Sequence, residues 1–242
     1  MFSESLVGAI HDYRWLLDRG YPEAGSISLV GDRFRLDRDE RHVLFRGVSA
    51  EVAARRRGAR IVPPEVVGAA ADGGNSDAAP RPVLGIDGHN VLLTVANYLR
   101  GVRTFECDDG LIRDIGGVHG RVRDGTLMAR AIHLAAETLS FLQGGPVTVE
   151  VCFDAPVSYS RKHAAMFQKA LEQRGVVCRV QAVSSPDTVL GAADPLFLAT
   201  SDSLIIDATA SGVYDLARHV IVSHFAPEFD SIRAVVADRC GG

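Results

Sequence analysis

Hydrophobic residues recur at helical spacing along the first 60 residues of the chain. In residues 3–19 they are spaced as on one face of a helix, at Leu6, Ile10, Tyr13, Leu16 and Leu17. Similar patterns predict three shorter helices, over residues 22–30, 38–47 and 49–57. Asp37 and Ser49 are residue types that cap helix N-termini, and they are expected to start the last two. The pattern therefore predicts a small all-α domain over residues 1–62.

The hydrophobic pattern is interrupted over residues 63–82. This stretch, PPEVVGAAADGGNSDAAPRP, contains four prolines and three glycines. Such a composition is typical of an interdomain linker, because proline and glycine interrupt helices and strands. We therefore expect a flexible linker here and a second domain over residues 83–242.

Strand and helix patterns alternate in this second domain. Strands are predicted over residues 83–86, 147–153, 176–183, 196–200, 204–206 and 219–223. Helices are predicted over residues 126–143, 158–174, 186–192 and 212–217, and another begins near residue 90. The alternation predicts an α/β fold with a mostly parallel sheet, because a parallel pair of strands needs a crossover connection.

Acidic residues end three of the predicted strands. Asp87 follows LGI, Asp154 follows VCF and Asp202 follows LATS, while Asp187 opens the helix before the last of these strands. The carboxyl ends of parallel strands meet at one edge of a sheet, where α/β proteins bind ligands. Carboxylates gathered there repel one another unless a cation intervenes, and an all-oxygen set suits Mg²⁺ or Mn²⁺. The alternative is that each acid is only a turn residue or a helix cap.

The overall composition is that of an ordinary soluble globular protein, with 47% hydrophobic and 23% charged residues and a net charge of −4. Residues 31–60 differ from this average, because they contain nine Arg and five acids. A local basic excess suits a polyanionic partner such as RNA. The alternative is a merely solvated, Arg-rich helical surface.

The four cysteines form no CxxC pair and lack the histidine spacing of a zinc site. The sequence has no signal-peptide pattern and no apolar run of membrane-spanning length. We therefore expect a cytoplasmic protein with no membrane partner. The oligomeric state is left open, with a homodimer among the alternatives.

The segment ECDDGLIRDIGGVHGR, at residues 106–121, combines glycines with charged residues. Its acids could add metal ligands, and Arg113, His119 and Arg121 could bind phosphate in a substrate. The alternative is a surface loop with capping acids, and no GxGxxG or P-loop pattern is present. Further along, Arg161, Lys162 and His163 could steer a nucleic-acid backbone, although an exposed helix start explains them equally well.

The motif series IDGHN, FDAP, SPDTVL and ATSDS resembles that of the PIN-like superfamily, especially its NYN branch. The whole chain resembles an uncharacterised prokaryotic two-domain family, in which a helical domain of unknown function precedes a PIN-like domain. This resemblance implies a three-layer α/β/α sandwich and the chemistry of metal-dependent ribonucleases. It implies metal ligation by Asp87, Asp187 and Asp202, with Asp154 as a neighbouring catalytic acid. Asn90 and Ser201 match polar positions that support such a site.

We therefore expect a hydrolase, namely a Mg²⁺- or Mn²⁺-dependent endoribonuclease that cleaves phosphodiesters with metal-activated water. One alternative is a non-catalytic RNA- or nucleotide-binding protein with the same fold. Another is a phosphoesterase of small molecules. It is disfavoured because one such enzyme class has a DxD pair after the first strand, whereas here Gly88 and His89 follow Asp87.

Overall fold

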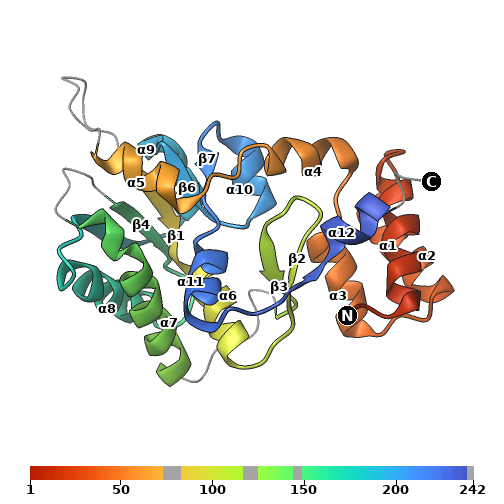
Figure 1. Ribbon diagram of the computed structural model, residues 1–242, viewed down its shortest axis with the longest axis horizontal. Helices are drawn as coiled ribbons and strands as arrows, with labels where there is room; N and C mark the ends of the chain where they lie inside the picture. The colour runs from red at the N-terminus through yellow and green to blue at the C-terminus, as the bar shows by residue number, and fades with distance from the viewer. Residues whose placement is uncertain (73–82, 117–124, 144–148, 239–242) are drawn as a thin grey trace. The chain divides into compact units, whose positions relative to one another are not determined.

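The computed structural model describes residues 1–72, 83–116, 125–143 and 149–238. The chain forms two compact units. The N-terminal unit comprises Met1–Ala59, Gly101–Gly117 and Glu228–Gly242, and the C-terminal unit comprises Arg60–Arg100 and Val118–Pro227. The helices and strands of both are labelled in Figure 1.

The N-terminal unit begins with four helices, close to where the hydrophobic pattern predicts them. They are α1 (Glu4–Leu17), α2 (Glu23–Arg33), α3 (Arg38–Gly47) and α4 (Glu51–Gly58). Ser3 caps α1, since its hydroxyl accepts a hydrogen bond from the Leu6 N–H at 3.1 Å. Asp37 and Glu40 form a reciprocal capping box at the start of α3. Ser49 does not cap α4: the N-cap residue is Ala50, and the Ser49 hydroxyl accepts from Arg57 at 2.9 Å.

A small sheet and a short helix complete the described part of the N-terminal unit. They are β2 (Thr104–Glu106), β3 (Ile112–Asp114), β8 (Asp230–Ser231) and α12 (Ile232–Ala237). Strand β2 lies between an antiparallel β3 and a parallel β8. This unit is therefore not purely helical, and it includes two segments that the sequence pattern assigned to the second domain.

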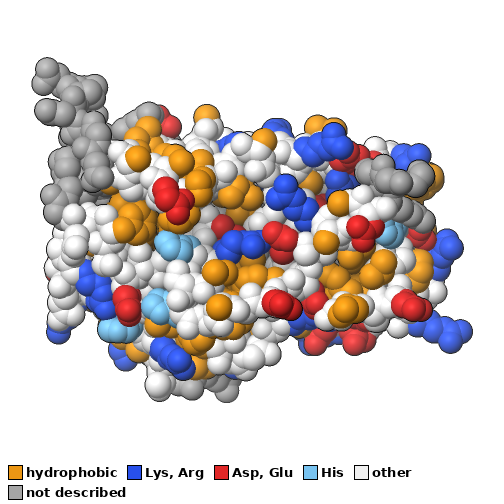
Figure 2. Space-filling model, viewed as in Figure 1, with side chains coloured by type: hydrophobic (Ala, Val, Ile, Leu, Met, Phe, Trp, Pro, Cys, Tyr) orange, Lys and Arg blue, Asp and Glu red, His pale blue; other side chains and the backbone are white. Residues whose placement is uncertain are grey.

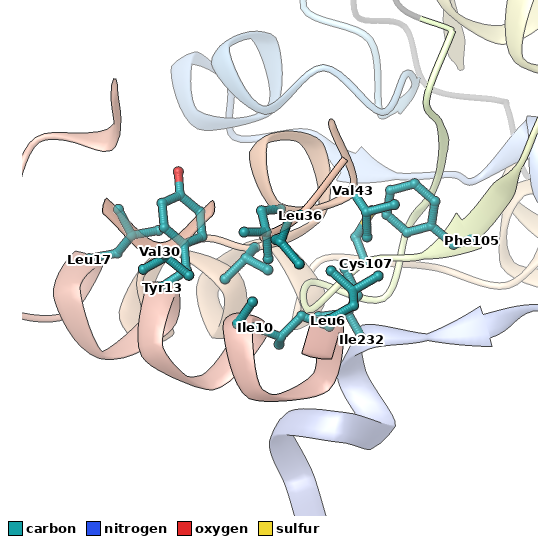
Figure 3. Packing of buried hydrophobic residues seen from close by; sticks show 13 residues of the cluster. Leu6, Ile10, Tyr13, Leu17, Val30, Leu36, Val43, Phe105, Cys107 and Ile232 are labelled. Atoms are coloured by element: carbon teal, nitrogen blue, oxygen red, sulfur yellow. The ribbon is translucent and has the colours of Figure 1, made fainter. Parts of the chain in front are cut away.

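Burial explains why these later segments belong to the N-terminal unit. Phe105, Cys107 and Ile232 are fully buried in one hydrophobic core with the apolar faces of α1, α2 and α3. Figure 3 shows their side chains converging with those of Leu6 and Val43. Without these three residues, the four short helices would leave part of their apolar surface exposed to water.

The C-terminal unit is an α/β fold with a five-stranded sheet. Its strands are β1 (Leu84–Asp87), β4 (Val149–Asp154), β5 (Cys178–Val183), β6 (Phe197–Ala199) and β7 (Gly212–Val213). They lie in the order β5-β4-β1-β6-β7, and every neighbouring pair is parallel. This confirms the predicted α/β class, the mostly parallel sheet and the helical N-terminal region.

Helices cover both faces of this sheet (Figure 1). They are α5 (Pro64–Asp72), α6 (Gly88–Leu99), α7 (Gly125–Thr138), α8 (Ser160–Glu172), α9 (Pro186–Ala193), α10 (Ser203–Ala208) and α11 (Leu216–Phe225), with a 3-10 turn at Leu139–Leu142. Successive strand residues point to opposite faces. Cys152 of β4 accordingly packs with Leu190 of α9, while the next residue, Phe153, contacts Phe167 of α8 with ring centroids 6.4 Å apart.

Three predicted elements near the C-terminus are wrong. Residues 204–206 and 219–223 were expected as strands but lie in α10 and α11, and residues 212–217 begin with β7 rather than a helix. Their β-branched residues favour strands in isolation. Side-chain caps override that preference, because Asp202 accepts from the Leu204 N–H and Asp215 from the Arg218 N–H, both at 2.9 Å.

The stretch predicted as a linker also differs in part. Residues 64–72 form α5, in which Val67 and Ala71 are buried. The rest of the predicted linker, residues 73–82, lies outside the described residues. No helix in the described ranges is long and apolar enough to cross a membrane.

Candidate functional site

The order of the strands reverses at β1. The chain runs from β1 to β4 and β5 on one side, and then returns to β6 on the other side of β1. Ligands of open α/β sheets bind outside the carboxyl ends of the strands where the order reverses in this way. Asp87 ends β1, and the sequence Thr200-Ser201-Asp202 directly follows β6.

Asp87 is buried, with 6% of its surface exposed, and each of its carboxylate oxygens accepts one hydrogen bond. Oδ1 accepts from the Asn90 N–H, as the cap of α6, and Oδ2 accepts from the Thr200 hydroxyl, both at 3.2 Å. Burial, together with repulsion from Asp154 and Asp202, raises the pKa of Asp87 to about 7, although the two hydrogen bonds lower it. This carboxyl group is therefore poised to change its charge near neutral pH.

Asn90 and Ser201 join the ends of β1 and β6. The Asn90 side-chain oxygen accepts from the Ser201 N–H at 2.8 Å and from the Ser201 hydroxyl at 3.0 Å. On the same side, the Thr200 hydroxyl accepts from the Asp202 N–H at 3.1 Å. The structure thus brings together Asn90, Ser201 and Asp87, three of the residues that the sequence singled out.

Asp154 ends β4 next to a buried histidine. His89 is 3% exposed, and its Nδ1 accepts from the Asp154 N–H at 3.0 Å and lies 3.2 Å from the Asp154 carboxylate. Burial lowers the pKa of His89, against the opposing effect of the Asp154 carboxylate. The other ring nitrogen of His89, Nε2, is buried and has no hydrogen-bond partner among the described residues.

Asp187 and Asp202 are the other two acids at this edge of the sheet, and with Asp87 and Asp154 they form what we call the acidic edge. Asp187 is exposed in the first turn of α9, and its pKa is raised by partial burial and by repulsion from Asp202 and Asp154. None of the four acids pairs with Lys or Arg in the part of the chain that the structure describes. The same part contains no group of three or more His, Cys, Asp or Glu residues that could hold a metal ion.

In the charged insert, residues 106–121, Arg113 does not lie where a substrate-binding role would place it. Arg113 is buried in the N-terminal unit, where its guanidinium binds both carboxylate oxygens of Asp109 at 3.0 and 2.8 Å. This pairing differs from the predicted contact with substrate phosphate. His119 and Arg121, the other two predicted phosphate ligands of the insert, lie outside the described residues.

Many arginines of residues 31–60 are paired within the N-terminal unit. Arg41 donates to Asp32 at 2.8 Å, Arg55 forms an ion pair with Glu51, and Arg57 donates to the Ser49 hydroxyl at 2.9 Å. On the face shown in Figure 2, basic and acidic side chains are interspersed. These contacts favour a solvated helical surface for the paired arginines.

The sequence grouped His163 with Arg161 and Lys162 as a possible contact for a nucleic-acid backbone, but it gave no sign that this residue, one turn into α8, contacts His89. Its ring centroid is 6.2 Å from that of His89, and its Nδ1 has no hydrogen-bond partner among the described residues. Burial lowers its pKa, as does the nearby His89. Only the fold brings these two rings together, since 74 positions of sequence offer no local signal for the contact.

Comparisons with known proteins divide the chain in two. A family model described as "Domain of unknown function (DUF5616)" matches residues 78–219, and one described as "Protein of unknown function (DUF434)" matches residues 5–60. The chain is similar to "Uncharacterized protein MJ0935" of Methanocaldococcus jannaschii, with 24% identity over 220 residues that cover 90% of this chain and 97% of the relative. No solved structure matches the chain. These matches fit the expected two-domain family of uncharacterised proteins.

Proposed function

The chain belongs to the family described as "Domain of unknown function (DUF5616)", and we propose that its C-terminal unit is a metal-dependent ribonuclease with a PIN-like fold. Support for the fold comes from the parallel sheet and from the motif series, whose acids lie at or beside the carboxyl ends of β1, β4 and β6. The proposed reaction is hydrolysis of RNA phosphodiesters by water.

One observation carries the proposal. Asp87 is a buried carboxyl group at the reversal of strand order, its neighbours Asp154 and Asp202 are also acids, and no described Lys or Arg compensates them. Burying negative charge without a cation is costly, so such a cluster either takes up protons or binds a cation. In the proposed reaction it binds a divalent cation.

The oxygen donors of this edge suit Mg²⁺ or Mn²⁺, although protein ligands alone do not close the site. Mg²⁺ usually keeps several waters and takes only one or two carboxylates, so three converging donors are not required. Asp87, Asp187 and Asp202 would hold the ion, partly through water, and Asp154 would add negative charge. When bound, such an ion stabilises the oxygens of a phosphodiester under attack and activates water.

The other residues of the edge would position these acids. Asn90 links the ends of β1 and β6 through Ser201, and Thr200 links Asp87 to the Asp202 backbone. The His89 ring would hold the end of β4, since its Nδ1 accepts from the Asp154 N–H and lies 3.2 Å from the Asp154 carboxylate. These contacts limit movement of the acids as charge develops in the reaction.

The experiment is cleavage of labelled single-stranded RNA in Mn²⁺ by the wild type and by Asp87→Asn. We expect the variant to be slower by at least about 100-fold, since changes even to outer partners of metal ligands cost 10–100-fold. Asp39→Asn, which removes an exposed acid of α3, should cleave at the wild-type rate. Equal cleavage by wild type and Asp87→Asn, or by neither, would contradict the proposal.

A second candidate is a non-catalytic RNA- or nucleotide-binding protein. It is favoured by the finding that no three potential metal ligands converge within the described residues. This function predicts salt-sensitive RNA binding that needs no divalent ion and that survives Asp202→Asn.

A further inference from the structure

The segment Ala155–Lys162 directly follows Asp154 and joins β4 to α8. Its residues line a cavity of about 410 Å³ in the C-terminal unit. The hydroxyl of Ser160 donates to the Ala155 carbonyl at 3.2 Å, which closes the turn. The lining of the cavity is aliphatic over residues 155–157 and hydroxyl-bearing, aromatic or basic over residues 158–162, and it is close in sequence to an acid of the proposed site.

Tyr159 presents an aromatic ring to solvent at this cavity. The residue is 72% exposed, and its ring centroid lies 6.3 Å from that of His163. Its backbone is left-handed, with φ 66° and ψ 13°, in a region that a bulky residue seldom occupies. An exposed aromatic ring is the kind of surface on which an unpaired nucleic-acid base stacks.

Arg161 and Lys162 are exposed in the first turn of α8 and have no ion pair or hydrogen bond from their side chains to described residues. Two other cations of the same unit have a carboxylate neighbour. Arg179 lies 4.0 Å from Glu150, and Arg218 lies 3.5 Å from Asp215. Two adjacent cations without carboxylate partners are available to bind phosphate.

We propose that residues 158–162 form a subsite for single-stranded nucleic acid, in which one base stacks on Tyr159 and the adjoining phosphates bind Arg161 and Lys162. This inference rests on the proposed function only in assigning Asp154 to a reaction site. A single strand is required because the bases of a duplex are already stacked on one another. The positive charge of the subsite also offsets the repulsion between the acidic edge and a polyanion.

Binding of a labelled RNA of about 12 nucleotides, a length typical of single-strand sites, tests the subsite by fluorescence anisotropy in EDTA. We expect Tyr159→Asn to bind at least about fivefold more weakly, since a stacked base contributes roughly 1–3 kcal/mol. Asn tolerates the left-handed backbone, so this variant keeps the turn. Tyr159→Phe retains the ring and should bind as the wild type does.

The two cations are tested by salt dependence. The double variant Arg161→Ala, Lys162→Ala should reduce the slope of log affinity against log salt by about 1.4, because each phosphate contact to a single strand contributes about 0.7. Lys169→Ala, an exposed cation in the last turn of α8, is the matched control and should change the slope by less. Single-stranded DNA of the same length distinguishes recognition of base and phosphate alone from recognition that includes the ribose hydroxyl.

The inference is overturned if the wild type does not bind single strands, if duplex RNA binds as tightly, or if Tyr159→Asn binds like the wild type. Equal effects of Lys169→Ala and the double variant would also overturn it. Because binding is measured without a divalent ion, the subsite and the proposed function fail separately. Weakened binding by Tyr159→Asn with no RNA cleavage by the wild type would refute only the nuclease.

Discussion

Each unit of this protein contains a buried aspartate with a pKa of about 7, and the two aspartates have opposite surroundings. Asp87 is 6% exposed and Asp108 is 8% exposed, and burial is the largest cause of the raised pKa at both. Around Asp108, Arg14 donates to the carboxylate at 3.0 Å and the Ser49 N–H donates at 2.6 Å. Around Asp87, the nearby charges that shift its pKa are acids.

The difference separates a structural carboxylate from a candidate functional one. Asp108 joins the turn after β2 to α1 and to the start of α4, and its charge has a cation within the same unit. The described residues offer Asp87 no such cation, so its ionised form requires one from solution. A raised pKa alone therefore does not identify a functional site, and the charges around the carboxyl group must be considered as well.

The largest effect is expected from Asp108→Ala, which should lower the free energy of unfolding by about 4 kcal/mol. The substitution leaves Arg14 without its carboxylate partner and the Ser49 N–H without an acceptor, and breaking one side of a buried pair typically costs 3–5 kcal/mol. Fluorescence of Trp15, the sole tryptophan of the chain, follows unfolding of this unit. Asp12→Ala, at a half-exposed ion pair, should cost less than about 1 kcal/mol. A similar loss of unfolding free energy in both variants would contradict the structural role of the Asp108 carboxylate.

Asp87→Asn should have the opposite sign and raise the free energy of unfolding by about 3 kcal/mol at pH 8 in EDTA. The pKa of Asp87 is raised from 3.8 to about 7, so between these values the folded protein holds a proton that the unfolded chain has lost. Stability therefore falls as the pH rises through this window, and the full penalty is present above pH 7. Each unit of pKa corresponds to about 1.4 kcal/mol, which makes about 4 kcal/mol the upper bound.

The gain of Asp87→Asn should disappear well below pH 3.8, the ordinary pKa of the group, where the carboxyl group is protonated in both states. Denaturant unfolding at several pH values measures this gain, with amide hydrogen exchange in β1 and β4 as the probe of unfolding. A gain that does not depend on pH would show that packing of the amide, and not the charge, causes it.

A smaller effect, about 1 kcal/mol, is expected from Thr200→Val. The substitution removes the hydroxyl that donates to Asp87 and accepts from the Asp202 N–H, and a typical hydrogen bond contributes about that much. It should also raise the pKa of Asp87 further, because the Thr200 hydrogen bond lowers it. Thr188→Val, whose hydroxyl contacts only Ser185 in an exposed turn, is the matched control. An unchanged pKa of Asp87 in Thr200→Val would show that the Thr200 hydroxyl does not stabilise the charged carboxylate.

Local patterns predicted the strand ends at Asp87 and Asp154 better than they predicted which segments make up each unit. The strand ends at Asp87 and Asp154 follow from apolar runs that end on a polar residue, and parallel pairing then brings them to one edge. By contrast, the burial of Phe105 and Ile232 in the helical core depends on contacts between segments that lie far apart in the sequence. Periodicity within a short window contains no information about such contacts.

The same limit explains the misassigned elements near the C-terminus. Val220 and Ile221 are β-branched and apolar, a pattern typical of a strand. Asp215 nevertheless caps a helix, which places both residues on one buried face. The contact between His89 and His163 was likewise unpredictable, because it depends on β1 and β4 lying side by side.

The most direct test of the account is a calorimetric titration of the metal-free protein with Mn²⁺ at pH 8. We expect the wild type to bind Mn²⁺, Asp87→Asn to bind it at least about 100-fold more weakly, and Asp108→Asn to bind it as the wild type does. The wild-type affinity should also rise with pH through about 7, because binding displaces the proton of Asp87. Equal Mn²⁺ affinity of wild type and Asp87→Asn, or an equal loss in both variants, would contradict the assignment of this edge as a cation site.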